Sequence, residues 1–462
     1  MIRELVRRRS RLVSVWRRVF ELSWPVATEQ VLRNLMRTTD VLVTGLFSPA
    51  AIAALGLADL YGRLPYRIGM GIGGGAIALS SQDTGSGATE NRDEAVTQAL
   101  LLGILFGVPF VIFGVTFGDV AISMLGAPEN VVTMGGTYLA IIFATTPARH
   151  LTLIGTRSLQ GIGDARTPMY INVASNLLNI AGTVALGLGL GFFPELEIVG
   201  VGIATAVGNV FSATVMVAIL WSNRTPIGFT RPTDFTITRQ LFSVSVPRIA
   251  EAGVVTITEF PFNAILLMFG TNVNAGYQVA RRIYQQLNAP LSRGYSVASS
   301  VLVGQAVGEG NIDDAHFNGW ATAGLGLSTV GLFGIGLHLY ANQIVLLFTS
   351  DSTTIRYATE FTQIYGLIAP LLVLYLVFVG GLQGGSDTRT PLFIQTVGLV
   401  ILRLGLAYVV AVALGYGLSG VYAAIVVYYV WLMVAAGTEF YRGTWADRAT
   451  EMMIQRGSGD TR

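Results

Sequence analysis

Four ionisable side chains fall within one apolar segment near the N-terminus, and their spacing could support ion chemistry. Glu29, Arg33, Arg37 and Asp40 are four, four and three residues apart, which places them on one face of an α-helix. A charged group inside a membrane span is costly and usually faces the protein interior or a water-filled path. The stripe is therefore either a mutually neutralising ladder or, at Asp40, a carboxylate that exchanges a proton or binds a hard cation.

A second polar stripe lies in a later apolar segment. Asn172, Asn176, Asn179 and Thr183 recur at intervals of four, three and four residues, and Thr205 lies in the apolar segment that follows. Amide and hydroxyl oxygens can complete the coordination of a hard cation around a carboxylate. The alternative is that these small polar groups form hydrogen bonds between neighbouring helices.

The second half of the chain has acids of its own. Glu251 and Glu259 are about two turns apart on one predicted helix, and Glu259 is the better candidate for contacting a cationic substrate. We expect a substrate cleft that includes both of these acids together with Glu29, Arg37 and Asp59. The arginines that could neutralise the acids or line the same cleft are Arg63, Arg281, Arg282 and Arg293.

The composition indicates that these stripes lie in a membrane. Of the 462 residues, 52% are hydrophobic and 12% are charged, whereas a soluble domain has about 25% charged residues. Continuous apolar runs of about 20 residues are long enough to cross about 30 Å of hydrocarbon as helices. Twelve spans are predicted, at 18–46, 51–82, 96–119, 131–160, 168–192, 197–222, 238–269, 272–305, 318–345, 355–383, 391–415 and 417–441.

Arginine, the only basic residue type apart from histidine, marks one side of the predicted membrane. One alternating set of connectors, which includes both termini, holds all of the connector arginines, whereas the other set holds none, although Arg356 lies just past one of its loops. The positive-inside rule then places both termini in the cytoplasm of a protein in the cell membrane. The arginines in this set beyond the basic N-terminal tail at 1–17 are Arg92, Arg166, Arg224, Arg231, Arg389, Arg442, Arg448, Arg456 and Arg462.

The chain contains an internal duplication. Ser23-Trp24-Pro25-x-x-x-Glu29 is matched by Ser245-Val246-Pro247-x-x-x-Glu251 at an offset of 222, and LQGIGDARTP at 159–168 is matched by LQGGSDTRTP at 382–391 at an offset of 223. The longer motif also reads as a helix stop followed by an Asp cap. The repeat predicts two six-helix lobes, at 18–222 and 238–441, joined by a cytoplasmic linker at 223–237, with a C-terminal tail at 442–462.

The repeated motifs, together with Asp40-x-x-x-x-Gly45 and ILRLGLAYVV at 401–410, resemble those of the MATE (multidrug and toxic compound extrusion) family over about residues 15–445, with a DinF-like or archaeal-type branch left open. The resemblance implies an all-α, V-shaped, twelve-helix transporter with a pseudo-two-fold axis along the membrane normal. It also implies an antiporter that expels organic, often cationic, compounds against H⁺ or Na⁺, works as a monomer in membrane lipid, and needs no cofactor.

The resemblance also suggests which residues couple transport to the ion. Asp40, Asn179 and Thr205 match family coupling positions and would hold Na⁺ if that is the ion, with Asn176 nearby. Thr183 departs from the pattern, because many relatives carry a second Asp there. Losing a carboxylate weakens a Na⁺ site, so H⁺ is favoured slightly.

The two halves differ at these coupling positions. At the repeat offsets, Asp40 corresponds to Phe262 and Asn179 to Leu402. We therefore expect the ion chemistry to lie in the first lobe alone.

Two other kinds of function are weighed against an exporter. A flippase for lipid-linked oligosaccharides or lipids belongs to the same superfamily, but twelve spans and Asp40 argue against it. A membrane-embedded enzyme is disfavoured, because we find no clustered nucleophile, base or metal ligands, and a receptor would need neither the charged intramembrane stripe nor the duplicated six-helix unit. No phosphate-binding loop occurs, so ATP-driven transport is disfavoured as well. His150, His316 and His338 are too scattered for a metal site, and nothing indicates a nucleic-acid partner.

Overall fold

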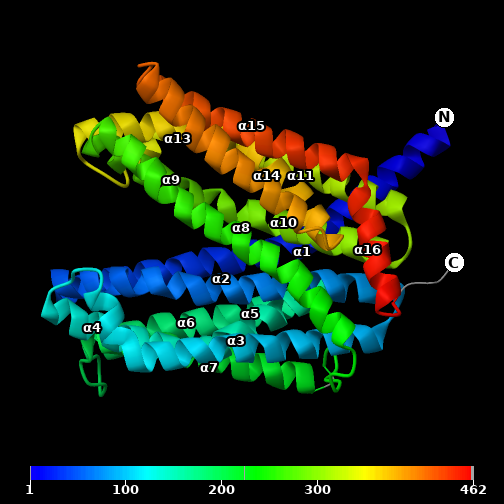
Figure 1. Ribbon diagram of the computed structural model, residues 1–462, viewed down its shortest axis with the longest axis horizontal. Helices are drawn as coiled ribbons and strands as arrows, with labels where there is room; N and C mark the ends of the chain where they lie inside the picture. The colour runs from blue at the N-terminus through cyan, green and yellow to red at the C-terminus, as the bar shows by residue number, and fades with distance from the viewer. Residues whose placement is uncertain (1, 223, 459–462) are drawn as a thin grey trace. The chain divides into compact units, whose positions relative to one another are not determined.

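A computed structural model describes residues 2–222 and 224–458 of the chain, and in these residues all regular structure is helical. Met1, Asn223 and residues 459–462 lie outside the described residues. They belong to the predicted N-terminal tail, linker and C-terminal tail, and they include Arg462. In the first half the helices are α1 (Ile2–Phe47), α2 (Pro49–Ser86), α3 (Thr89–Ser123), α4 (Glu129–Ala144), α5 (Thr146–Gly161), α6 (Arg166–Leu188) and α7 (Glu197–Trp221) (Figure 1).

The second half repeats this order with more interruptions. Its helices are α8 (Phe235–Met268), α9 (Thr271–Leu287), α10 (Ala289–Gly308), α11 (Ile312–Leu339), α12 (Ala341–Val345), α13 (Ser352–Gly384), α14 (Arg389–Val397), the π-helical turns η1 (Gly398–Gly405) and η2 (Ala407–Ala413), α15 (Leu418–Arg442) and α16 (Thr444–Gln455).

Each of the twelve predicted spans coincides with a helix or with a consecutive helix group, so the predicted all-α fold of twelve spans is confirmed. By length and composition, eight of the described helices could cross a membrane, or nine if α4 and α5, bent by 48° at Thr145, count as one. Three predicted spans are less apolar than this, namely α1, α2 and the pair α9–α10. They carry Glu29, Arg37, Asp59 and Arg281. The ionisable groups singled out from the sequence thus lie mainly on the less apolar spans.

Contacts divide the chain into two compact units. The unit made of 28–80 and 88–245 contains α3 packed along α4 and α5, and α6 packed along α7. Its core includes Leu55, Leu139, Phe143 and Val201, all buried. Buried glycine allows α7 to approach α6, since a Cβ at Gly200 would lie 2.5 Å from the carbonyl oxygen of Leu186.

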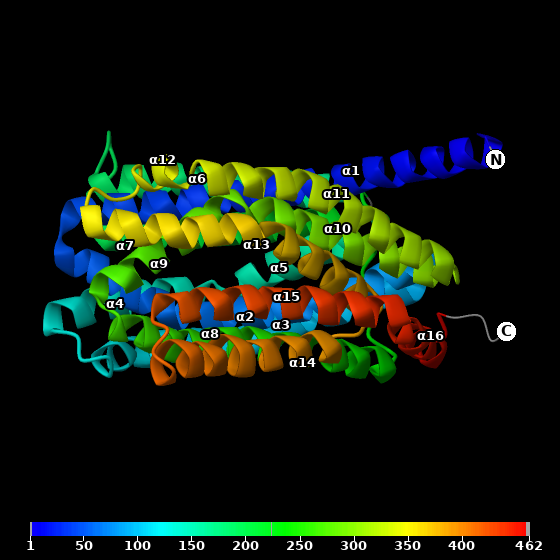
Figure 2. The same ribbon diagram turned by 90° about the horizontal axis from the view of Figure 1, so that it is seen from above.

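The other unit is made of 1–27, 81–87 and 246–462, so α1, α2 and α8 each contribute residues to both units. Within it, α13 packs against α9, α10, α11 and α15 (Figure 2). Its core is rich in aromatic side chains, with Phe262, Tyr277 and Phe361 in successive edge-to-face contacts.

The repeated LQG-x-x-D-x-R-T-P motif forms equivalent helix starts in the two halves. At the start of α6, the Asp164 carboxylate accepts from the backbone N–H of Thr167 at 2.9 Å. At the start of α14, Asp387 accepts from the N–H of Thr390 at 3.2 Å. The predicted capping role is therefore confirmed in both copies, and the two acceptors are again 223 residues apart.

Candidate functional site

The carboxylate of Asp40 lies buried on α1, and its side chain faces α6. The residue is 7% exposed, and its Oδ1 accepts a hydrogen bond from Thr183 Oγ1 at 2.9 Å. The ion pairs formed among the described residues do not include Asp40. An acid that is buried, hydrogen-bonded and not paired with arginine is able to change its charge state during a transport cycle.

A chain of hydrogen bonds extends from Asp40 across α6 to α7. Thr183 also faces Asn179 Oδ1 at 3.3 Å, and Asn179 Nδ2 donates to Thr205 Oγ1 at 3.0 Å. Thr205 in turn donates to the backbone oxygen of Val201. The structure thus brings together Asp40, Asn179, Thr183 and Thr205 from three helices, as the spacing and the resemblance led us to expect.

The direction of each hydrogen bond in this chain follows from counting protons. Because Thr205 donates to Val201, it accepts from Asn179, so Asn179 Oδ1 faces Thr183. The single hydroxyl proton of Thr183 therefore has two acceptors, Asn179 Oδ1 and an ionised Asp40. If Asp40 is protonated, its own O–H can donate to Thr183, and the Thr183 proton then serves Asn179. Protonation of Asp40 therefore supplies the one proton that is missing, so that each contact in this chain can be a hydrogen bond.

Asn176 and Asn172 lie further back on the same stripe of α6. Asn176 is buried, but among the described residues it makes no hydrogen bond to the four linked side chains. Asn172 donates to Thr156 of α5 at 3.3 Å. The structure therefore places Asn176 beside the Asp40 network and outside its hydrogen-bonded chain.

Asp40 forms no ion pair but lies within electrostatic reach of Arg37, and the other charged residues of α1 and α2 have arginine neighbours as well. Arg33 donates to the Glu29 carboxylate and to the Tyr66 hydroxyl, the latter at 3.0 Å. Asp59 lies within electrostatic reach of Arg37, Arg63 and Arg149. The pair Glu29–Arg33 is thus the neutralised ladder considered from the sequence, and it neighbours a cluster rich in arginine.

In the second half, Glu259 has both carboxylate oxygens engaged. Its Oε2 accepts from Arg281 Nη1 and its Oε1 from Arg403 Nη1, each at 2.8 Å. Arg403 also donates to the Tyr277 hydroxyl and lies over the Phe262 ring at 4.0 Å from the centroid. Glu251 is partly exposed within electrostatic reach of Arg248 and does not join this cluster.

Comparison with known proteins identifies the family. A model of the MatE family matches residues 25–184 and 247–409, which together make up more than two thirds of the chain. The chain belongs to the MatE family. The two matched stretches begin at Pro25 and Pro247, 222 residues apart, and so reproduce the internal repeat.

Two curated MatE relatives align over most of their length. The chain is 24% identical to a probable multidrug resistance protein NorM of Thermotoga maritima over 93% of both chains. It is 25% identical to a probable multidrug resistance protein YoeA of Bacillus subtilis, over 77% of this chain and 78% of that protein.

Solved structures of the family show the same fold. An outward-facing multidrug resistance MATE family transporter superposes with a TM-score of 0.84 at 22% identity, covering 95% of this chain and 96% of that one. A MATE transporter in the straight conformation superposes with a TM-score of 0.85, at the same identity and coverage. This MatE chain is therefore a multi-pass membrane protein with the two-lobe fold of these transporters.

Sequence reasoning missed some residues around the MatE site. Arg149 of α5 lies over the Tyr66 ring at 4.8 Å from the centroid, beside the Asp59 cluster, and Tyr277 completes the Arg403 cluster. Arg149 could have been found from the sequence, because it is an arginine inside an apolar span. Tyr66 and Tyr277 gave no comparable signal, since aromatic residues are common in such helices.

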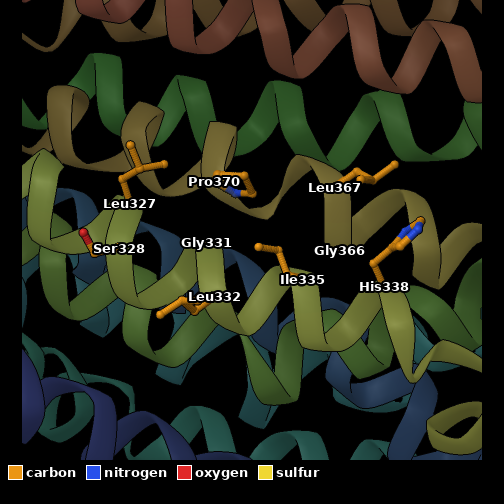
Figure 3. Close-up of a pocket in the computed structure, with 9 residues that line it drawn as sticks. All are labelled: Leu327, Ser328, Gly331, Leu332, Ile335, His338, Gly366, Leu367 and Pro370. Atoms are coloured by element: carbon orange, nitrogen blue, oxygen red, sulfur yellow. The ribbon is translucent and has the colours of Figure 1, made fainter.

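An apolar groove of about 580 Å³ lies between α11 and α13, and its lining residues include no member of the polar clusters described above (Figure 3). Among its lining residues only His338 can ionise, and its Nδ1 lies 3.0 Å from the backbone oxygen of Gln363. Gly331 leaves room in the groove, since a Cβ there would lie 3.9 Å from the nearest side-chain atom, whereas Gly366 allows α13 to approach the backbone of α11. Its chemistry suits hydrocarbon and offers nothing for ion coupling.

Proposed function

We propose that this MatE protein is a secondary active exporter of small lipophilic, often cationic, compounds, driven by inward movement of H⁺ and with Na⁺ as the alternative coupling ion. The relatives named as multidrug resistance proteins support the export of small compounds. In this proposal the protein works in the cell membrane by alternating access between its two lobes, and both termini are cytoplasmic. The lobe boundaries at 18–222 and 238–441 belong to the same proposal.

The observation that carries the coupling proposal is the Asp40 network. An exchangeable proton needs a carboxylate that is buried, lacks a fixed cationic partner and has neighbours able to reorganise when its charge changes. Asp40 with Thr183 and Asn179 has these properties, because the Thr183 proton can turn from one oxygen to the other. Binding a proton would remove the only formal charge of the network and alter the contact between α1 and α6.

The same oxygens define the alternative. Na⁺ would be held as transported cargo by oxygens of Asp40, Asn179 and Thr205, with Thr183 adding a hydroxyl. Such a site contains one carboxylate, and the affinity of hard cations depends on ligand charge. The proton-counting argument adds to this, because a proton completes the network without needing further ligands.

The test is efflux of a fluorescent cation, ethidium, from proteoliposomes under an imposed H⁺ or Na⁺ gradient. We expect wild-type efflux to follow the H⁺ gradient, and Asp40→Asn to abolish the gradient-dependent part. Asp119→Asn, an exposed acid on α3, is the matched control and should behave as wild type. Equal gradient-driven efflux in Asp40→Asn and wild type would overturn the coupling role, and a response to Na⁺ alone would overturn H⁺ as the ion.

A further inference from the structure

The two halves of the chain carry a charged pair of opposite polarity at the same repeat positions. At the offset of 222, Arg37 on α1 corresponds to Glu259 on α8, and Asp59 on α2 corresponds to Arg281 on α9. Helices α2 and α9 begin at Pro49 and Thr271, which have the same offset, so this register holds where the second pair lies. The acid and the base have exchanged helices between the repeats.

Arg403 gives the second-half cluster excess positive charge, because it adds a second guanidinium group to the Glu259–Arg281 pair. Glu259 is bonded through both oxygens, to Arg281 and to Arg403, so one carboxylate faces two guanidinium groups. Its side chain is 16% exposed, that of Arg403 10% and that of Arg281 31%. Arg403 is further occupied by Tyr277 and Phe262. The acid is thus already satisfied, and Arg281 is the most accessible charged group of the three.

A neighbouring arginine extends this positive surface. Arg282 is exposed and forms no ion pair with any of the described residues. The buried face of α9 is apolar, with Val273, Tyr277 and Ile283 directed to the core. Arg281 and Arg282 lie about 15 Å from the start of α9, within the span predicted at 272–305. A guanidinium group within a membrane span faces the protein interior or a water-filled path, because hydrocarbon solvates it poorly.

We propose that Arg281 and Arg282 form a binding site for an anionic group, a carboxylate, on the transported compound. The site deepens the proposed export function and rests on it, because it gives the substrate class as amphipathic molecules that carry a carboxylate, including zwitterions. Guanidinium groups bind carboxylates through paired N–H donors. Gln278, one turn earlier on α9, donates to Asn263 at 2.7 Å, so the adjacent surface is polar as well. Glu259 holds Arg281 in place and is not itself the substrate contact.

A matched pair of dyes tests this site. Tetramethylrhodamine carries a free carboxylate, and its methyl ester differs only in that group, so their affinities isolate the anion. Binding to the purified full chain in phosphatidylcholine nanodiscs is measured by fluorescence anisotropy. We expect Arg282→Gln to weaken binding of the acid about tenfold, the factor for one charge-assisted hydrogen bond, and to leave binding of the ester unchanged.

Two further variants make the test specific. Arg281→Gln should also lose affinity for the acid, and it leaves Glu259 paired with Arg403, so the fold is retained. Arg356→Gln removes an exposed arginine at the start of α13, outside the cluster, and should change neither affinity. Equal effects on acid and ester, or no effect in either α9 variant, would overturn the proposal. Loss of acid binding when phosphatidylglycerol is added would assign the arginines to a lipid phosphate and would also overturn it.

This outcome can be separated from the coupling proposal. Dye binding is measured without a gradient, so Asp40→Asn should keep the wild-type ratio of acid to ester affinity even where it abolishes efflux. A normal ratio with unaffected efflux in Asp40→Asn would contradict ion coupling at Asp40 alone. A ratio that is insensitive to both α9 arginines would contradict the carboxylate site alone.

Discussion

At the residue scale, position 183 decides whether the Asp40 network contains one carboxylate or two, because this chain has Thr183 where many relatives carry an Asp. Thr183→Asp would place a second acid beside Asp40, where additional ligand charge favours a dehydrated hard cation. We predict that this variant becomes dependent on a Na⁺ gradient in the ethidium efflux assay. Thr183→Ser keeps the hydroxyl donor and should retain the ion dependence of wild type. A Thr183→Asp protein that still follows only the H⁺ gradient would show that carboxylate number does not select the ion.

Single residues also show what the sequence could and could not establish. Asp40, Asn179, Thr183 and Thr205 were predicted to meet because helical spacing fixes the face of each side chain, and the family resemblance supplied which helices adjoin. The pairing of Glu259 with Arg403 spans 144 residues and depends on how η1 packs against α8, so spacing within either helix carried no information about it. For that reason Glu259 looked available to a cation, although both of its oxygens are occupied.

At the scale of helices, the contact between α6 and α7 positions Thr205 against Asn179. A side chain at Gly200 would meet the carbonyl of Leu186, a backbone atom that cannot move aside. We predict that Gly200→Val lowers stability by about 1–3 kcal/mol, the usual cost of overpacking, and reduces gradient-driven efflux because α7 moves away from α6. The measurements are thermal unfolding in detergent and ethidium efflux. Gly56→Ala, where a Cβ meets nothing within 4 Å, should match or exceed wild-type stability.

The helix boundaries were largely predictable, but their irregularities were not. Hydropathy and the repeat located α14 with η1 and η2 as one span at 391–415, since both depend only on the order of residues. The π-helical turns from Gly398 to Ala413 have no counterpart in the equivalent helix α6, and neither they nor the 48° bend between α4 and α5 leave a signal in hydropathy. Arg403 lies within η1, so the irregular turn is the one that brings a guanidinium group to Glu259.

At the scale of the whole molecule, one ion pair joins two segments that are far apart in the sequence. Arg456, just after α16, bonds to Asp83 near the end of α2 at 2.7 Å, and both side chains are fully buried. Arg456 also donates to Gln82, whose amide donates to the backbone oxygen of Gly384 at 2.7 Å. Residues 81–87 and the C-terminal helix belong to the same compact unit, so this network is internal to it. The sequence predicted only a cytoplasmic tail here, because the partner of Arg456 is 373 residues away.

Removing one member of this pair leaves the other charge buried. We predict that Arg456→Ala lowers the free energy of unfolding by about 3–5 kcal/mol, the usual cost of an uncompensated buried charge. Arg456→Met combined with Asp83→Leu removes both charges and should cost clearly less than the single change, because no lone charge remains. The measurement is chemical unfolding of the purified chain followed by tryptophan fluorescence. Arg442→Ala is the control: its pair with Glu439 is exposed, and such pairs contribute about 0–1 kcal/mol. A double variant as unstable as Arg456→Ala would show that α16 docks through packing and that the buried ion pair contributes little.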